Sequence, residues 1–264
     1  MKKLTLVLGG GACKGYAHIG VIKALEMAGI KPDLVVGTSM GAIVGGFYCS
    51  GLNWAQLIDI GINLTRGKLM DFNPFNALWG SGILSGKKLK KIFIQYIGDI
   101  THAQLQIPFI AIATDILNGK LVCLQDGSVV ENMLASSAIP GVFPLVRKNS
   151  QTLCDGGLLN NVPDDVARKL SKNDVVLSID VIAEYDRQVE TSKNKIMEVS
   201  INALTLMQTE ITRLQGDCSD LRINISQPDV AQMSFDDASI KKSINYGETA
   251  MRKYISKLKK MLQD

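Results

Sequence analysis

The stretch from Leu34 to Ile58 carries no Asp, Glu, Lys or Arg, and this uncharged run constrains the fold more than any other feature. Its length would suit a membrane-spanning helix, but five glycines and several polar side chains interrupt it. The run divides into a short apolar segment, Leu34–Gly37, and a segment of small residues, Met40–Cys49. We therefore predict a buried strand that turns directly into a buried helix.

The same alternation of short apolar strands and helices continues along the chain, with Asn118-Gly119 as the expected turn of a hairpin. Such alternation is typical of an α/β fold with a largely parallel sheet. The expected strands are Lys3–Leu8, Leu34–Gly37, Phe109–Ile116, Leu121–Leu124, Thr152–Cys154, Val175–Val181 and Leu221–Ile225. The expected helices are Tyr16–Ala28, Met40–Cys49, Val129–Ala138, Val162–Leu170, Lys195–Leu214 and Ile240–Leu262.

The positive charge is concentrated at one end of the chain. The 264 residues have a net charge of +4, but Ser239 to Asp264 holds seven Lys/Arg against two acids. That segment sums to +5 and the rest of the chain to −1. The body of the protein therefore has no basic excess, and we expect no nucleic-acid partner.

The five cysteines form no CxxC pair, and the chain has only two histidines. A Cys/His zinc site is therefore not expected, and the thiols fit a reducing compartment. We predict neither a metal nor a cofactor. Lys2 and Lys3 resemble the start of a signal peptide, but the apolar run Leu4–Leu8 behind them is too short, so we expect a cytoplasmic protein.

A serine lies where the uncharged strand turns into its helix, in the pattern Gly37-Thr38-Ser39-Met40-Gly41. A sharp strand-to-helix turn exposes a serine hydroxyl at the carboxyl edge of a sheet, and flanking glycines relieve crowding there. Ser39 is therefore a candidate nucleophile. The alternative interpretation is a glycine-rich turn that serves only close packing.

A second glycine-rich loop, Gly9-Gly10-Gly11-Ala12-Cys13-Lys14-Gly15, joins the first strand to the first helix. Its glycine spacing does not match a dinucleotide fingerprint, and Tyr16-Ala17 follows where a P-loop needs Lys-Ser/Thr. Backbone N–H groups at the start of a helix can instead hold an oxyanion beside a serine nucleophile. A plain tight turn remains the alternative.

A nucleophilic serine needs a base, and the chain offers few. His18 falls in the first turn of a helix, where the helix dipole disfavours a protonated imidazole, so a packing role is the better interpretation. His102 lies in a polar stretch that we expect at the surface. Asp155 follows a short strand and begins an Asp-Gly-Gly turn, which makes it the better candidate, although Asp-Gly is also a common turn.

Taken in order, the glycine loop 9–15, the serine turn 37–41 and Asp155-Gly156-Gly157 resemble the three signatures of patatin-like phospholipases. The segments 113–115 and 135–144 resemble that family as well. The similarity spans about 4–181 and looks closest to short bacterial members, which are similar to the esterase domain of neuropathy target esterase. It implies a three-layer α/β/α fold in one domain over 1–264, with further strand and helices at 195–262.

The resemblance also implies roles for individual residues. Ser39 would be the nucleophile and Asp155 its proton acceptor, in a Ser–Asp dyad without histidine. Gly10, Gly11 and Ala12 would form the oxyanion hole; the wider family has a glycine at the position of Ala12, and the bacterial branch often varies there. The implied supporting residues are Gly9, Lys14, Gly15, Gly37, Gly41, Gly156 and Gly157.

These observations predict a serine acyl hydrolase that cleaves fatty-acyl esters of phospholipids or lysophospholipids through an acyl-enzyme. A carboxylesterase or thioesterase for soluble acyl substrates and a non-catalytic lipid-binding protein remain alternatives. Segment 65–84 is a candidate lid, and its apolar stretch 70–79 could contact a membrane. The basic last helix could add attraction to anionic lipids, so peripheral contact with the inner membrane face is an open alternative.

Overall fold

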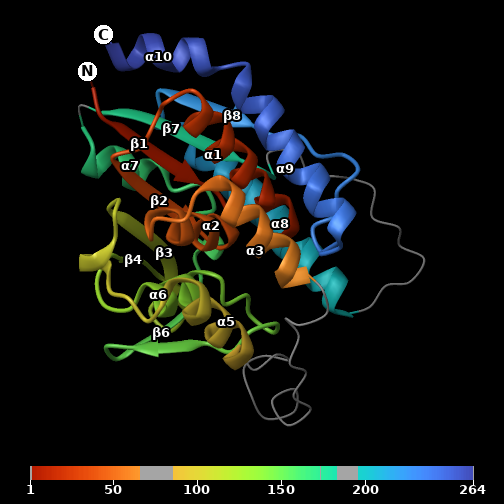
Figure 1. Cartoon of the computed structure of the whole chain (residues 1–264). Coiled ribbons are helices and arrows are strands. Elements are labelled where there is room, and N and C mark those ends of the chain that lie inside the picture. The colour runs from red at the N-terminus through yellow and green to blue at the C-terminus, as the bar shows by residue number, and fades with distance from the viewer. Residues whose placement is uncertain (1, 66–85, 173, 183–195, 264) are drawn as a thin grey trace.

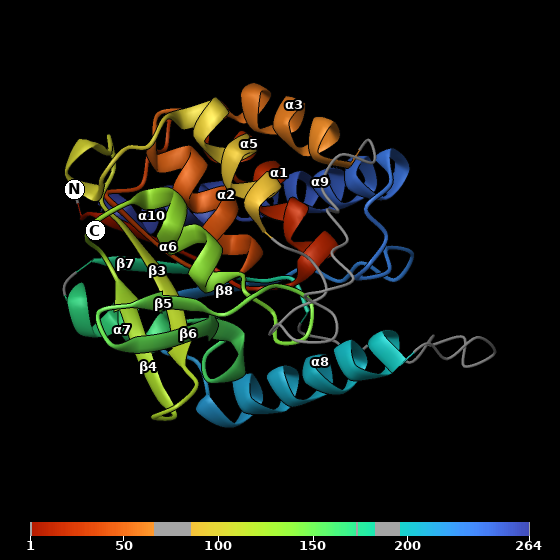
Figure 2. The same ribbon diagram turned by 90° about the horizontal axis from the view of Figure 1, so that it is seen from below.

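All the predicted strands form, and together they build one mixed sheet with helices on both faces (Figures 1 and 2). The computed structural model describes residues 2–65, 86–172, 174–182 and 196–263. The strands are β1 (Leu4–Leu8), β2 (Leu34–Thr38), β3 (Phe109–Asp115), β4 (Lys120–Leu124), β5 (Val146–Lys148), β6 (Gln151–Asp155), β7 (Val175–Asp180) and β8 (Leu221–Asn224). The described helices are α1 (Ala17–Met27), α2 (Met40–Cys49), α3 (Trp54–Thr65), α5 (Lys87–Ile97), α6 (Val129–Ser136), α7 (Asp164–Leu170), α8 (Ile196–Gln215), α9 (Asp237–Arg252) and α10 (Ile255–Gln263).

The sheet is largely parallel, as the alternation of strands and helices predicts. Its strand order is β5-β6-β3-β2-β1-β7-β8, and the strands from β3 to β8 along this path run parallel. The antiparallel strands β4, β5 and β6 gather at the β3 side. β3 and β4 form the expected hairpin, with Asn118-Gly119 in its turn.

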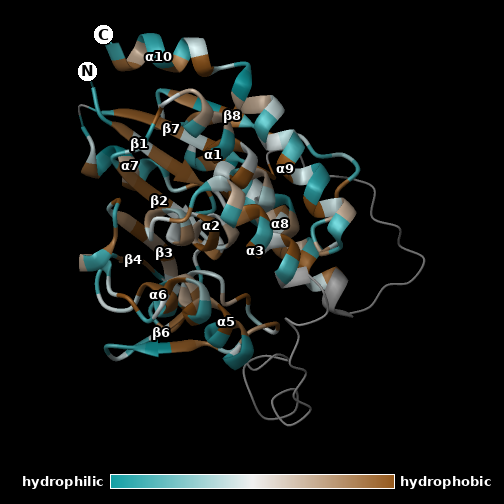
Figure 3. Cartoon of the chain, viewed as in Figure 1, coloured by the Kyte–Doolittle hydropathy of each residue, from teal (hydrophilic) through white to brown (hydrophobic). Residues whose placement is uncertain are grey.

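The two faces of the sheet bury cores of unequal size because successive side chains of a strand point to opposite faces. In β1, Leu4, Leu6 and Leu8 face the large core with α1, α2 and α9, whereas Val7 faces the small core with α7. Figure 2 shows α7 and α8 on this second face, and Figure 3 shows β1 and β2 as hydrophobic strands between the two helix layers. The expected three-layer α/β/α architecture is confirmed.

The predicted single helix over 240–262 is wrong, because two helices, α9 and α10, replace it. Lys253 and Tyr254 donate their N–H groups three residues back, to Ala250 and Met251, so the last turn of α9 tightens and the chain changes direction. The sequence prediction also lacked α3, α5 and β5. The candidate lid 65–84 lies, apart from Thr65, outside the described residues.

Helix α9 holds the glycine loop in place from the large-core side. It packs backbone to backbone on α1, since a Cβ on Gly20 would collide with the Ile244 carbonyl and one on Gly247 with the Ala17 carbonyl. This closeness lets the Ser243 hydroxyl donate to the Lys14 carbonyl at 3.0 Å. None of the described helices is both long and apolar enough to span a bilayer.

Candidate active site

The ends of two strands meet over the middle of β3. β2 runs parallel to β3 and ends with Thr38 opposite Ile112, whereas β6 runs antiparallel and ends with Asp155 opposite Ala113. β4 pairs with the same residues of β3 along its opposite edge. β2 and β6 therefore both lie on the remaining edge of β3, where the end of one strand approaches the end of the other. The strand pairing therefore brings Ser39, which follows Thr38, against Asp155.

Ser39 occupies a strained turn, as the sequence predicts. Its backbone has φ +54° and ψ −122°, a conformation that residues other than glycine rarely adopt and that gathers at functional sites. A Cβ on Gly37 would lie 2.7 Å from the Gly41 carbonyl, and a Cβ on Gly41 would collide with the Leu8 carbonyl. The flanking glycines are therefore required by close packing of this turn.

A second serine, Ser136, holds the backbone of Ser39 in place. The Ser39 N–H donates to the Ser136 hydroxyl at 3.0 Å, and that hydroxyl donates to the Ile112 carbonyl at 2.5 Å. Ser136 is fully buried at the end of α6, so it ties α6, β3 and the strained turn together. The Ser136 hydroxyl thus restrains the backbone of Ser39 without contacting its side-chain oxygen.

The side chains of Ser39 and Asp155 form a direct pair. The Ser39 hydroxyl donates to Asp155 Oδ2 at 2.6 Å, and Asp155 Oδ1 accepts the Gly157 N–H at 2.8 Å. Asp155 is only 2% exposed, and burial raises its pKa to about 6, against the opposing effect of the two hydrogen bonds. The pair therefore combines a serine hydroxyl with a carboxylate that titrates near neutral pH.

The glycine loop lies against the nucleophile, but one of its N–H groups is already engaged. A Cβ on Gly10 would lie 3.2 Å from the Ser39 Cβ, which places the loop beside the serine. The Gly10 N–H donates to the Asn161 carbonyl at 3.1 Å, so in this structure it already has an acceptor. Among the described residues, the Gly11 and Ala12 N–H groups have no acceptor, and Ala12 has a positive φ of 46°.

The remaining predicted site residues support the loops. The Gly9 N–H donates to the Ile179 carbonyl at 3.0 Å and continues the sheet. A Cβ on Gly15 would collide with the Met40 side chain, and one on Gly156 with the Ile112 carbonyl. Lys14 is buried, and its carbonyl accepts the Gln227 amide at 2.9 Å.

Neither histidine is bonded to the pair within the described part of the chain. His18 is fully buried, burial lowers its pKa to about 4, and its Nε2–H donates to the Gly9 carbonyl at 2.7 Å. His102 is half-buried rather than on the surface as expected. Its Nδ1 donates to the Phe109 carbonyl at 3.1 Å, and its Nε2 accepts from Asn132 at 2.8 Å. Both imidazoles are therefore committed to structural hydrogen bonds.

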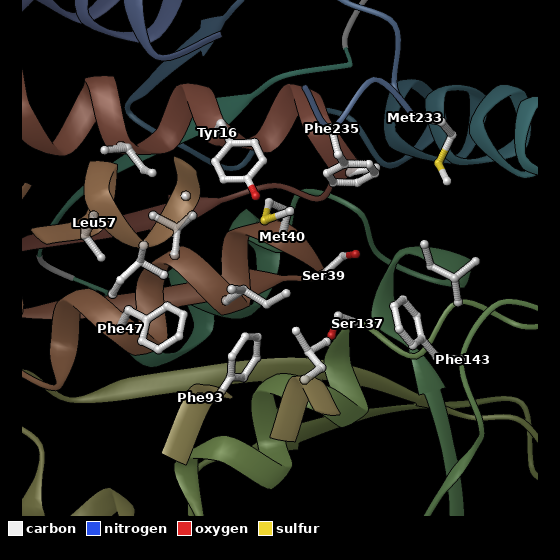
Figure 4. A pocket seen from close by; sticks show the side chains of 18 of the residues that line it. Tyr16, Ser39, Met40, Phe47, Leu57, Phe93, Ser137, Phe143, Met233 and Phe235 are labelled. Atoms are coloured by element: carbon white, nitrogen blue, oxygen red, sulfur yellow. The ribbon is translucent and has the colours of Figure 1, made fainter. Parts of the chain in front are cut away.

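An apolar cavity of about 490 Å³ opens at Ser39, and Figure 4 shows the serine hydroxyl among its lining side chains. Phe47 and Leu57 lie toward one end, and Phe143 and Met233 toward the other. Phe47 and Leu57 are each 2% exposed, so their end is closed. The remaining labelled side chains along the cavity are Tyr16, Met40, Phe93, Ser137 and Phe235.

The chain matches a family model described as "Patatin-like phospholipase" over residues 6–168. The chain belongs to the patatin-like phospholipase family. An uncharacterized NTE family protein of Mycobacterium tuberculosis is 37% identical over 166 residues, which cover 61% of this chain and 44% of that protein. The human patatin-like phospholipase domain-containing protein 6 is 30% identical over 192 residues, 71% of this chain and 14% of that protein.

One further relative in sequence and one solved structure are also similar to this patatin-like chain. The Drosophila melanogaster neuropathy target esterase sws is 32% identical over 195 residues, or 69% of this chain and 13% of that protein. The crystal structure of VipD from Legionella pneumophila shares the fold with a TM-score of 0.56 at 14% identity, covering 97% of this chain and 67% of VipD. The chain spans less than half the length of the curated relatives described here.

Two residues of the patatin-like site escaped residue-by-residue reasoning. Ser136 is an ordinary helix residue in sequence, and only its place in segment 135–144, which resembles the family, pointed to it. Asn161 is the fourth residue after Gly157, and its amide donates to the Gly10 carbonyl at 3.3 Å. That contact joins residues 151 positions apart, so no local pattern could indicate it.

Proposed function

We propose that this protein is a serine acyl hydrolase that cleaves fatty-acyl esters of phospholipids or lysophospholipids. The observation that supports it best is the 2.6 Å hydrogen bond from Ser39 to the buried Asp155 at the wall of a large apolar cavity. A serine activated by a base is a nucleophile, and an apolar cavity of this size suits an acyl chain. Membership of the patatin-like family favours the same activity.

Acylation follows from the geometry of the pair. Asp155 Oδ2 accepts the hydroxyl proton as Ser39 Oγ attacks the ester carbonyl carbon. The N–H groups of Gly11 and Ala12, which have no acceptor among the described residues, would stabilise the negative oxygen that develops. The leaving alkoxide then takes the proton from Asp155, and the acyl group stays on Ser39. An Asp155 pKa of about 6 leaves the carboxylate ionised at neutral pH, as a base requires.

The closed end of the cavity would receive the acyl tail. Phe47 and Phe93 stack edge to face there, with ring centroids 4.9 Å apart, and Leu57 from α3 lies at the same end. Each methylene buried among such side chains contributes about 0.8 kcal/mol to binding. A long acyl chain would therefore gain several kcal/mol over a short one, which favours a lipid ester over a small soluble ester.

Membrane contact is part of this proposal, but the position of α10, the second part of the predicted basic helix, does not favour a role for that helix. The Lys2 N–H donates to the Leu262 carbonyl at 2.9 Å, so the end of α10 lies beside the start of β1. Ser39 lies at the opposite, carboxyl edge of the parallel strands. Attraction of α10 to anionic lipid would thus hold Ser39 away from the surface. The apolar stretch 70–79, which would make the contact instead, lies outside the described residues.

The test combines active-site labelling with a substrate panel. A fluorophosphonate probe should label the native protein at Ser39, and Ser39→Ala should remain unlabelled. Ser178→Ala is the matched control, because Ser178 is also buried but bonds Ser219 at 2.8 Å in another part of the sheet. Labelling of another serine in the native protein would contradict the assignment.

The panel separates the alternatives. Phospholipid vesicles and lysophospholipid micelles should both give a higher kcat/KM than soluble butyryl esters and thioesters, because only the lipids fill the cavity. Faster cleavage of the soluble esters or thioesters would favour a carboxylesterase or thioesterase. A protein that binds the lipids but cleaves none of the panel would be a non-catalytic lipid-binding member of the fold.

A further inference from the structure

A second hollow adjoins Ser39, and a larger share of its lining is polar than in the apolar cavity. It holds about 30 Å³ and shares Ser39, Ala12 and Ile139 with the cavity. Its polar lining side chains are Ser39, Asp155, Asn161, Thr205, Gln208 and Gln232. We name it the polar crevice. About 30 Å³ is room for one or two water molecules and too little for a lipid headgroup.

One buried acceptor in the polar crevice has no hydrogen-bond partner among the described residues. Asn161 is 1% exposed, and its Nδ2 donates to the Gly10 carbonyl, which can only accept, so the orientation of the amide is fixed. Its Oδ1 accepts no hydrogen bond from the described residues. The Thr205 hydroxyl donates to Gln232 Oε1 at 2.7 Å. A buried oxygen without a donor is costly unless a water molecule fills the place.

Three polar atoms of the polar crevice converge beside Gly157. A Cβ on Gly157 would collide with Gln208 Nε2, and it would lie 3.0 Å from Asn161 Oδ1 and 3.1 Å from Asp155 Oδ1. Asn161 comes from the loop after β6, and Gln208 from α8, so distant parts of the chain supply the group. Asp155, Asn161 and Gln208 all line the polar crevice, and the absence of a side chain at Gly157 leaves space between them.

We propose that the polar crevice holds the water that releases the acyl group, and that Asn161 and Gln208 position it. The proposal rests on the acyl-enzyme of the proposed function. Once Ser39 is acylated, its oxygen no longer donates to Asp155 Oδ2, so that carboxylate can accept one water hydrogen. Asn161 Oδ1 accepts the other hydrogen and Gln208 Nε2 donates to the water oxygen, which leaves one lone pair for attack.

The release step then balances as the reverse of acylation. The water oxygen bonds to the acyl carbon while Asp155 takes one water proton. The tetrahedral centre collapses, the bond between the acyl carbon and Ser39 Oγ breaks, and the proton on Asp155 passes to Ser39 Oγ. The products are the fatty acid and free Ser39. Asn161 is thus a positioning residue for release and has no part in the attack of Ser39.

The experiment measures acylation and release separately in the full-length protein. With a p-nitrophenyl fatty-acyl ester, nitrophenol release reports acylation, and rapid quenching with intact-mass analysis reports the loss of the acyl-enzyme. Asn161→Ala should slow release about 10- to 100-fold, the value of one or two hydrogen bonds to the reacting water, with acylation within about threefold. The acyl-enzyme should accumulate, and hydroxylamine, a stronger small nucleophile, should restore turnover more in the variant than in the wild type.

Asn160→Ala is the matched control. Asn160 is the neighbouring buried asparagine, its Oδ1 also lacks a partner among the described residues, and it does not line the polar crevice. Asn160→Ala should leave the ratio of release to acylation unchanged. Equal slowing of both steps in Asn161→Ala, or no slowing of release, would overturn the proposal.

Gln208→Ala tests the proposal if Asn161→Ala does not fold. Gln208 lies half-buried on α8, so its truncation leaves no cavity in the core and the variant should fold. This variant should slow release about tenfold without slowing acylation, and an unchanged release rate would reject the proposal. A wild type that shows no nitrophenol release and no adduct on Ser39 would instead reject the proposed function itself.

Discussion

The two hollows that meet at Ser39 differ in size, lining and origin. The apolar cavity holds about 490 Å³ and is built mainly by α2, α3 and α5 on the large-core face. The polar crevice holds about 30 Å³ and is built by α8 and the loop after β6. Ser39 and Ala12 belong to both, but Asp155 lines only the crevice. The comparison suggests a division in which one side binds the acyl chain and the other handles protons and water.

The largest effect should come from removing the base on the crevice side. Asp155→Asn keeps the shape of the side chain and can still accept the Gly157 N–H, but it cannot take the Ser39 proton. We expect kcat/KM to fall at least a thousandfold, or about 4 kcal/mol, with an unchanged circular dichroism spectrum. Activity within tenfold of wild type would show that the crevice side does not supply the base.

The same substitution should stabilise the protein at high pH. Burial raises the pKa of Asp155 from 3.8 to about 6. The protonated carboxyl therefore stabilises the folded state fully below pH 3.8, and this stabilisation is lost as the pH rises through 6. A rise of about two pKa units corresponds to ~3 kcal/mol. Asp155→Asn should therefore unfold at higher temperature than wild type at pH 8, and the two melting curves should approach each other near pH 4.

A smaller effect should follow from shortening the apolar cavity. Leu57 lies at the closed end, so Leu57→Phe should displace the end of a long acyl chain. Excluding two methylenes costs ~1.6 kcal/mol, or more than tenfold in kcat/KM for palmitoyl esters. The kcat/KM of Leu57→Phe for butyryl esters should stay within about threefold of wild type. The volume-conserving Leu57→Met should leave the ratio of kcat/KM for palmitoyl and butyryl esters as in wild type. An equal loss on both esters would mean that the acyl chain lies elsewhere.

The sequence predicts much of the fold because strand and helix periods are local properties. Met40–Cys49 forms as expected, and the glycine-flanked turn before it places Ser39 at a strand end. The sequence could not predict that β2 and β6 share one edge of β3, because that arrangement depends on which strands pair. The break between α9 and α10 has the same origin: apolar spacing continues through Tyr254, with neither glycine nor proline to end the helix.

Neither of the two hollows could be predicted from the sequence, and the reasons are opposite. The cavity is lined by residues such as Phe47 and Phe93, whose spacing in the sequence is that of ordinary core residues. An apolar side chain that lines a cavity has the same sequence spacing as one that packs against a neighbour. The crevice depends on Asn161 and Gln208, polar residues whose sequence context suggests turn and surface. Only their tertiary contacts reveal that Asn161 is buried and that both side chains line the same hollow as Asp155.

The pH profile offers a further test of the division, because Asp155 belongs only to the crevice. The carboxylate must be ionised to act as a base, and its pKa is about 6. We expect kcat/KM to rise with pH through about 6 and to be level above pH 7, with roughly a tenfold loss for each unit below 6. Palmitoyl and butyryl esters should give the same profile. A profile that changes with acyl length would mean that the two hollows are coupled.

The smallest effect should come from the histidines, and it tests whether Asp155 works alone. A Ser-His-Asp site loses orders of magnitude in rate without its imidazole, whereas a Ser–Asp site needs none. His102 bonds Phe109 and Asn132, and His18 bonds Gly9, so in the described structure neither ring faces the Ser39 hydroxyl as a hydrogen-bond partner. We predict that His102→Gln keeps kcat/KM within about tenfold of wild type, or ~1.4 kcal/mol, and loses mainly stability. His18→Asn should behave alike if it folds. If His102→Gln were as inactive as Asp155→Asn, a histidine-dependent hydrolase would replace the dyad, and the crevice would lose its role as the proton-handling side.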